Sequence, residues 1–120
     1  MDRFRDLERA GVSGKKDSAL LAAVAGYEAV QRPADREKAQ FTRLFVALFE
    51  FASDEARRTA SAALSRLPDV PHDVAMAIVR APLEISAPFL AFGLSLQDDL
   101  LIELAATLEL PKVKAIARRS

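Results

Sequence analysis

Residues 41–58 read FTRLFVALFEFASDEARR, and this stretch decides the fold. Its large apolar side chains recur every three or four residues, which is the spacing of one helix face. Ser53 is followed by two acidic residues, as at a helix start. The stretch therefore predicts the end of a main core helix and the start of another helix that turns back antiparallel to it. The face contains Phe41, Leu44, Phe45, Leu48 and Phe49, and Val46 and Phe51 lie on its flanks.

Similar helix-start signals recur along the whole chain. They stand at Pro33, Ser53, Pro71, Pro82, Ser95 and Pro111. Each is followed by apolar residues at helical spacing, and no segment sustains the alternation of a strand. Short amphipathic helices cannot bury their apolar faces singly, so we expect them to stack on one another. The sequence predicts an all-α fold, namely a HEAT-like helical repeat bundle or short α-solenoid of about seven to eight helices.

The N-terminal part predicts two helices separated by a turn. A first helix is expected over about Asp2 to Ala10, and residues 11–14, GVSG, are expected to form the turn. Asp17 or Ser18 is expected to cap the second helix. Residues 11–18 resemble a phosphate-binding loop only superficially, because the spacing between their glycines differs from that of the motif. The apolar stripe of the second helix contains Leu20, Val24, Tyr27 and Val30.

The elements after Pro71 are shorter, and connections of a few residues between them predict tight helix hairpins. Pro88 lies inside one helical pattern and cannot donate to the carbonyl group of Glu84, so we expect a kink or a break there. Residues 71–80 and 111–119 resemble each other, since each has a proline start, an apolar stripe and a basic end. Their spacing of roughly 40 residues is typical of HEAT-type repeats.

The composition limits the classes of protein to which the chain can belong. A chain of 120 residues with 51% hydrophobic and 28% charged residues fits one soluble globular domain over residues 1–120. Its 17 basic and 17 acidic side chains cancel, which disfavours a dedicated nucleic-acid binder. Cysteine is absent, so disulfides and thiolate zinc sites are excluded. The start has no signal-peptide core and residues 85–96 are too short to span a bilayer, which predicts a cytoplasmic protein without membrane insertion.

Several stretches together resemble a known family. They are residues 44–49, LFVALF; 53–58, SDEARR; 81–90, APLEISAPFL; 96–102, LQDDLLI; and 114–119, KAIARR. Over about Phe41 to Arg119 the chain resembles the alphaproteobacterial domain-of-unknown-function family DUF2336, which has HEAT-like helical repeats. The resemblance implies an all-helical repeat module and brings no active-site residues. Members of this family are often longer, so it also implies that residues 1–120 can be the N-terminal part of a longer chain.

Residues that carry chemistry elsewhere have ordinary structural interpretations here. His72 is the only histidine and follows Pro71, as a polar residue in a first helical turn does. Asp98, Asp99 and Glu103 have a spacing that could hold a divalent cation, but acids just after Ser95 are also typical of a helix N-terminus. The phenylalanines of residues 41–49 indicate core rather than a base-stacking platform. We therefore expect no catalytic site, cofactor or metal, and hence no enzyme.

The charge distribution indicates where a partner would bind. Residues 84–109 contain acidic but no basic side chains, and residues 112–119 contain basic but no acidic ones. Such segments pair internally, cap the last helix, or present a bipolar surface to a partner. We expect a protein–protein interaction module, adaptor or regulatory, with homo-oligomers also open; nucleic-acid binding along a basic edge is the alternative. The candidate surface comprises Arg57, Arg58, Asp98, Asp99, Glu103, Lys112, Lys114, Arg118 and Arg119.

Overall fold

The computed structural model describes the backbone of residues 3–119 and the side chains of residues 14–119. This part of the chain is entirely helical, with seven helices and no strand, so the predicted all-α class is confirmed. The helices are α1 (Arg3–Ala29), α2 (Asp35–Phe49), α3 (Asp54–Ser65), α4 (His72–Arg80), α5 (Leu83–Phe92), α6 (Asp98–Thr107) and α7 (Leu110–Ala117).

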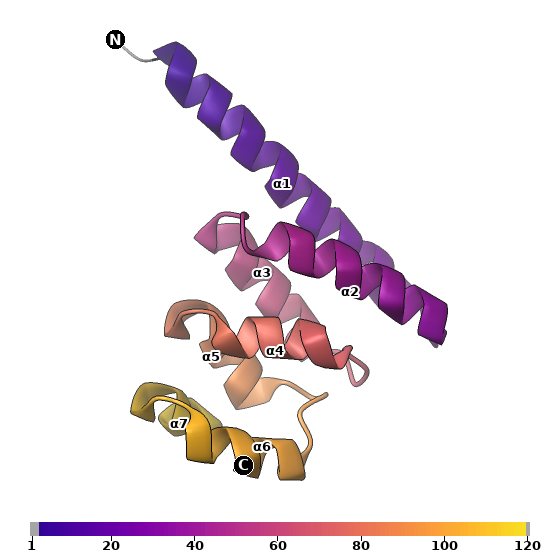
Figure 1. Cartoon of the computed structure of the whole chain (residues 1–120), viewed down its shortest axis with the longest axis vertical. Coiled ribbons are helices and arrows are strands. Elements are labelled where there is room, and N and C mark those ends of the chain that lie inside the picture. Colours follow the sequence, from indigo (N-terminus) through magenta and orange to yellow (C-terminus); the bar gives the residue numbers. More distant parts are fainter. Residues whose placement is uncertain (1–2, 120) are drawn as a thin grey trace.

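The helices form two layers. In one layer α1 packs on α3, α3 on α5, and α5 on α7. The other layer contains α2, α4 and α6, of which α2 packs on α1 and α4, and α6 packs on α7. Figure 1 shows α2, α4 and α6 in front of α3, α5 and α7. The main neighbours of α3 are thus α1 and α5, so the predicted antiparallel pair of α2 and α3 is not a packing unit. The result is a flat body of 51 × 35 × 19 Å.

One continuous apolar cluster runs through these layers, from Leu20 on α1 to Ala115 on α7. The predicted stripe of α1 is confirmed for Leu20, Val24 and Tyr27, which are buried, whereas Val30 follows the end of the helix and is half-buried. Small residues of α3, including Ala56 and Ala60, are also buried and allow α1 and α5 to approach closely.

Three phenylalanines of α2 form an aromatic row in this core. Phe41, Phe45 and Phe49 are buried, with ring centroids 5.6 Å apart for the first pair and 4.8 Å for the second. Tyr27 of α1 stacks on Phe41 at 4.2 Å and so extends the row across the α1–α2 contact. The core interpretation of the phenylalanines is confirmed. The buried arc is narrower than predicted, however, since Leu44 and Val46 are exposed.

The predicted turn at residues 11–14 is wrong, because α1 continues through it as one helix. A glycine costs a helix interior only about 1 kcal/mol, and the alanines, leucines and lysines around these glycines favour the helix. Asp17 therefore caps no helix of its own. Its carboxylate accepts hydrogen bonds from the backbone N–H of Ser53 at 2.8 Å and from the Ser53 hydroxyl at 2.6 Å.

Ser53 is the N-cap of α3, as predicted, and its Oγ accepts a hydrogen bond from the backbone N–H of Ala56 at 3.2 Å. The hydroxyl thus connects Asp17 of α1 to the first turn of α3. The other predicted starts lie within three residues of the observed ones; α6, for example, begins at Asp98, three residues after Ser95.

Two expectations for the C-terminal half need correction. Of the kink or break expected at Pro88, the break is wrong, because α5 continues through this residue from Leu83 to Phe92. The similar residues 71–80 and 111–119 form α4 and α7, which occupy different layers. Their similarity therefore does not mark equivalent positions in a repeat, and it reflects the shared pattern of a short amphipathic helix.

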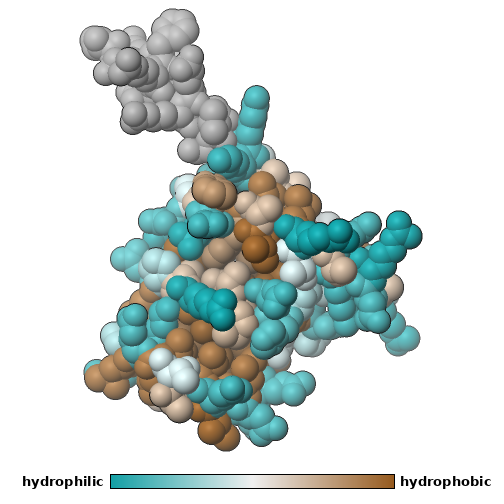
Figure 2. All heavy atoms as spheres, in the orientation of Figure 1, coloured by the Kyte–Doolittle hydropathy of each residue, from teal (hydrophilic) through white to brown (hydrophobic). Residues whose placement is uncertain are grey.

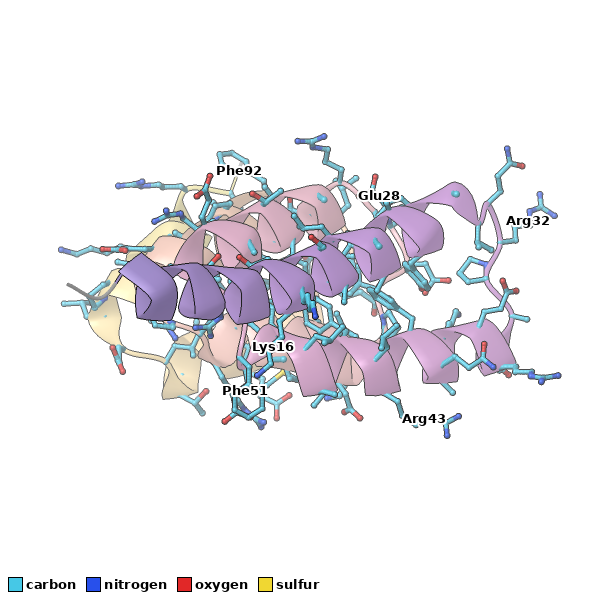
Figure 3. All side chains as sticks on the ribbon, turned by 90° about the horizontal axis from the view of Figure 1, so that it is seen from above. Lys16, Glu28, Arg32, Arg43, Phe51 and Phe92 are labelled. Carbon is cyan, nitrogen blue, oxygen red and sulfur yellow. The ribbon has the colours of Figure 1, made fainter. Side chains whose placement is uncertain are left out.

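Large apolar side chains are also exposed at several places. Figure 2 shows apolar residues gathered at the lower end of the molecule, where Figure 1 places α6 and α7. Ile102 on α6 and Leu110 on α7 are 71% and 66% exposed, and Phe92 also points outward in Figure 3. Figure 3 further shows Lys16 of α1 next to the exposed Phe51, whose ring centroid lies 4.8 Å from the ammonium group. None of the described helices has the length and apolarity that crossing a membrane requires.

Candidate functional site

The candidate surface chosen from the charge pattern is divided between two regions. Arg57 and Arg58 lie on α3, whereas the acidic residues lie on α6 and the other basic residues on α7 or just after it. Because α5 packs between α3 and α7, these regions are separate (Figure 1). Arg58 forms a long ion pair of 3.8 Å with Glu84 of α5.

Lys112 does not belong to an accessible surface. Its side chain is buried, and its Nζ donates a hydrogen bond of 2.8 Å to the backbone carbonyl of Val79 on α4. Arg119 donates to the carbonyls of Leu90 at 2.9 Å and Gly93 at 2.6 Å. Both cations thus meet carbonyl groups at the ends of α4 and α5, where the helix dipole is negative. The inclusion of Lys112 in a partner surface is therefore wrong. Arg119 has little freedom to bind a partner, because its guanidinium group is already bound by two carbonyl groups.

The remaining candidate residues are exposed. Asp98 and Asp99 lie in the first turn of α6, where the first-turn interpretation placed them, and Glu103 follows one turn later. Lys114 and Arg118 are exposed at the end of α7. Within the described residues, no ion pair joins these acids to these bases. His72 is exposed in the first turn of α4, and no group of three or more potential ligands among residues 14–119 is placed to hold a metal.

A larger site surrounds Arg57, and sequence reasoning did not assemble it. A hollow of about 500 Å³ opens where the ends of α2 and α4 approach the start of α3. We call it the Arg57 groove. Its walls come from three segments of the chain, residues 46–50, Arg57 and residues 77–82, which no sequence spacing connects. The lining residues are Val46, Phe49, Glu50, Arg57, Ala77, Arg80, Ala81 and Pro82.

The Arg57 side chain is 18% exposed and contacts both Phe49 and Asp54. Its guanidinium carbon lies 4.7 Å from the centroid of the Phe49 ring, a cation–π contact with a buried aromatic residue. Its ion pair with Asp54 is long at 3.8 Å, and the Asp54 side chain is 72% exposed. The Nε atom is buried and has no hydrogen-bond partner among the described residues. Arg57 therefore has unused hydrogen-bonding capacity at a fixed position.

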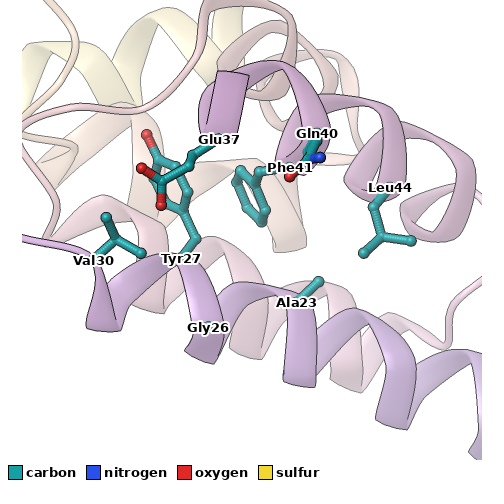
Figure 4. A pocket seen from close by; sticks show the side chains of 8 residues that line it. All are labelled: Ala23, Gly26, Tyr27, Val30, Glu37, Gln40, Phe41 and Leu44. Atoms are coloured by element: carbon teal, nitrogen blue, oxygen red, sulfur yellow. The ribbon is translucent and has the colours of Figure 1, made fainter. Parts of the chain in front are cut away.

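A smaller hollow of about 200 Å³ lies between α1 and α2 (Figure 4). Figure 4 shows Tyr27 and Phe41 at its wall, with Glu37 beside them. The Tyr27 hydroxyl donates a hydrogen bond of 2.7 Å to the carbonyl oxygen of Asp69. The Asp69 carboxylate forms an ion pair of 3.0 Å with Lys38. These contacts hold α1, α2 and the α3–α4 loop together. We therefore assign this hollow a structural role.

Burial of the Tyr27 phenol, with a further effect of Asp69 and Glu37, raises its pKa from 10.0 to about 12. Since the raised pKa belongs to the folded state, the contribution of Tyr27 to stability is complete below pH 10 and lost as the pH rises through about 12. The chain has one tyrosine and no tryptophan, so tyrosinate absorbance measures this group alone. In a pH titration we expect the midpoint of the tyrosinate absorbance change to lie at a clearly higher pH for the native chain than for the urea-unfolded chain. Equal midpoints would contradict the burial, and Tyr27→Phe should lose less stability over the same pH range.

No protein-family model matches the chain, and neither a characterised protein nor a solved structure matches it.

Proposed function

We propose that this chain is a non-enzymatic protein-interaction module, adaptor or regulatory in its role, whose helices form a HEAT-like array of the DUF2336 type in the cytoplasm. Two features support the proposal. The helices stack in two layers with each helix packed on near neighbours, which is the arrangement of α-solenoids. Large apolar side chains on both layers are also exposed, as at surfaces that bind other proteins.

The main observation that supports the proposal is the Arg57 groove. Its volume of about 500 Å³ and its apolar lining suit an inserted side chain, while the arginines at its wall can fix the orientation of a partner. Arginine and aromatic residues that are partly buried before binding are typical centres of protein interfaces. Arg57 over Phe49 provides such a centre.

The nucleic-acid alternative receives less support from the same geometry. The basic edge it requires contains Lys112, which is buried, and Arg119, whose guanidinium group is bound by two carbonyl groups. Phosphate binding needs accessible cations in a continuous row. The exposed cations that remain lie on α3 and α7, with α5 between them.

A photo-crosslinking amino acid at position 46 tests the proposal. Val46 is exposed and lines the groove, so the substitution leaves the core intact. We expect a discrete crosslinked protein in cell extract, and none from the same group at the exposed Arg36 in the first turn of α2. The captured protein should bind the purified chain, and Val46→Asp should weaken that binding about tenfold or more. Equal crosslinking at both positions, or unchanged affinity of Val46→Asp, would contradict the proposal.

A further inference from the structure

The charges of the Arg57 groove are arranged for a negatively charged ligand group. Arg57 and Arg80 line it together with one acid, Glu50, and the second nearby acid, Asp54, makes only a long ion pair of 3.8 Å with Arg57. Arg80 is the last residue of α4 and is exposed, and no ion pair among the described residues involves it. Two guanidinium groups at one hollow provide the donors that a carboxylate accepts in pairs.

Arg57 is prepared for such a ligand before it arrives. Contact with the Phe49 ring restrains the guanidinium group, which lowers the entropy lost on binding. Its partner Asp54 is exposed and distant enough to be exchanged for a closer carboxylate, because exposed ion pairs contribute little.

The rest of the lining is apolar. Val46, Ala77 and Pro82 provide small or medium side chains around the arginines. An apolar side chain of the ligand can cover these residues while its carboxylate contacts Arg57 and Arg80. A free carboxylate ion would leave this surface uncovered, so the lining fits a peptide better than a small anion.

We propose that the Arg57 groove binds a peptide segment of a partner protein in which an aspartate or glutamate is next to a large apolar residue. This inference rests on the proposed function and specifies the chemistry of the partner. The arginines also lie near the negative C-terminal ends of α2 and α4, so a purely structural role for them is the competing interpretation.

A phage-displayed library of random short peptides tests this inference on the purified full chain. We expect the selected peptides to share an acid beside leucine, isoleucine or phenylalanine. Replacing that acid by its amide, or using Arg80→Gln, should weaken binding about tenfold, as should Arg57→Gln. Arg43→Gln is the matched control, because Arg43 is exposed on α2 and points away from the body in Figure 3.

The other outcomes overturn the inference. Selected peptides without a shared acid, or with unchanged affinity for Arg80→Gln, would show that the arginines do not read a carboxylate. A lower melting temperature of the arginine variants with unchanged affinity would assign them to helix ends alone. Displacement of the peptide by oligothymidylate at the same concentration would indicate a phosphate ligand instead. Failure to select any peptide would also exclude this partner class, whereas specific crosslinking at position 46 would still support the proposed function.

Discussion

Phe45→Ala is expected to lower the free energy of unfolding by about 3–5 kcal/mol. Phe45 is fully buried and lies between Phe41 and Phe49 in the aromatic row, so the truncation removes both ring contacts and leaves a cavity. The neighbouring helices α1 and α4 are fixed by other contacts and cannot collapse into the space. Urea denaturation followed by circular dichroism measures the change.

The matched control is Leu44→Ala, one residue earlier on α2. Leu44 is 49% exposed, so its truncation should cost less than about 1 kcal/mol. The comparison separates the loss of core packing from any change in helix propensity, since both variants introduce alanine into the same helix. A loss below about 1 kcal/mol for Phe45→Ala would contradict its position in the core.

Lys112→Glu is expected to destabilise the chain by about 3–5 kcal/mol, because it places a buried carboxylate opposite the carbonyl oxygen of Val79. The charge now repels the group that accepted the ammonium hydrogen bond. Lys114→Glu makes the same charge change two residues later at an exposed position of α7, and should change stability by only about 0.5 kcal/mol.

Lys112→Met separates the loss of the hydrogen bond from the burial of a new negative charge. It keeps the apolar stem and removes only the donor, so a loss of about 1–3 kcal/mol is expected from the unpaired Val79 carbonyl. Chemical denaturation of the three variants provides the comparison. Equal stabilities of Lys112→Glu and Lys114→Glu would show that the ammonium group of Lys112 is not inside the protein.

Local patterns predicted most of the helices correctly. The phenylalanine spacing of residues 41–49 predicted the buried face of α2, and Ser53 with its two following acids predicted the start of α3. These signals succeed because helix periodicity and N-capping depend on residues within one or two turns. Gly11 and Gly14 misled for the converse reason: glycine is common at helix ends, but the residues around it decide whether the helix continues.

The candidate site was less predictable, because its contacts join distant parts of the chain. Lys112 lies on the same face of α7 as the buried Ala115, and that register is a sequence signal for its inward position. No comparable signal exists for the Arg57 groove, where Phe49, Arg57 and Arg80 come from three helices. The charge pattern found Arg57 but not its neighbours, since a count of charges contains no information on which helices pack together.

The stacking of each helix on near neighbours in the chain also has a consequence for synthesis. α1 can form its contacts with α2 and α3 as soon as these two helices have left the ribosome, and each later helix adds to a surface that already exists. Contacts between segments close in sequence need little loop closure, which favours rapid folding. The chain can therefore assemble in the order in which it is made, with Ser53 joining Asp17 before the residues of the Arg57 groove from α4 are present.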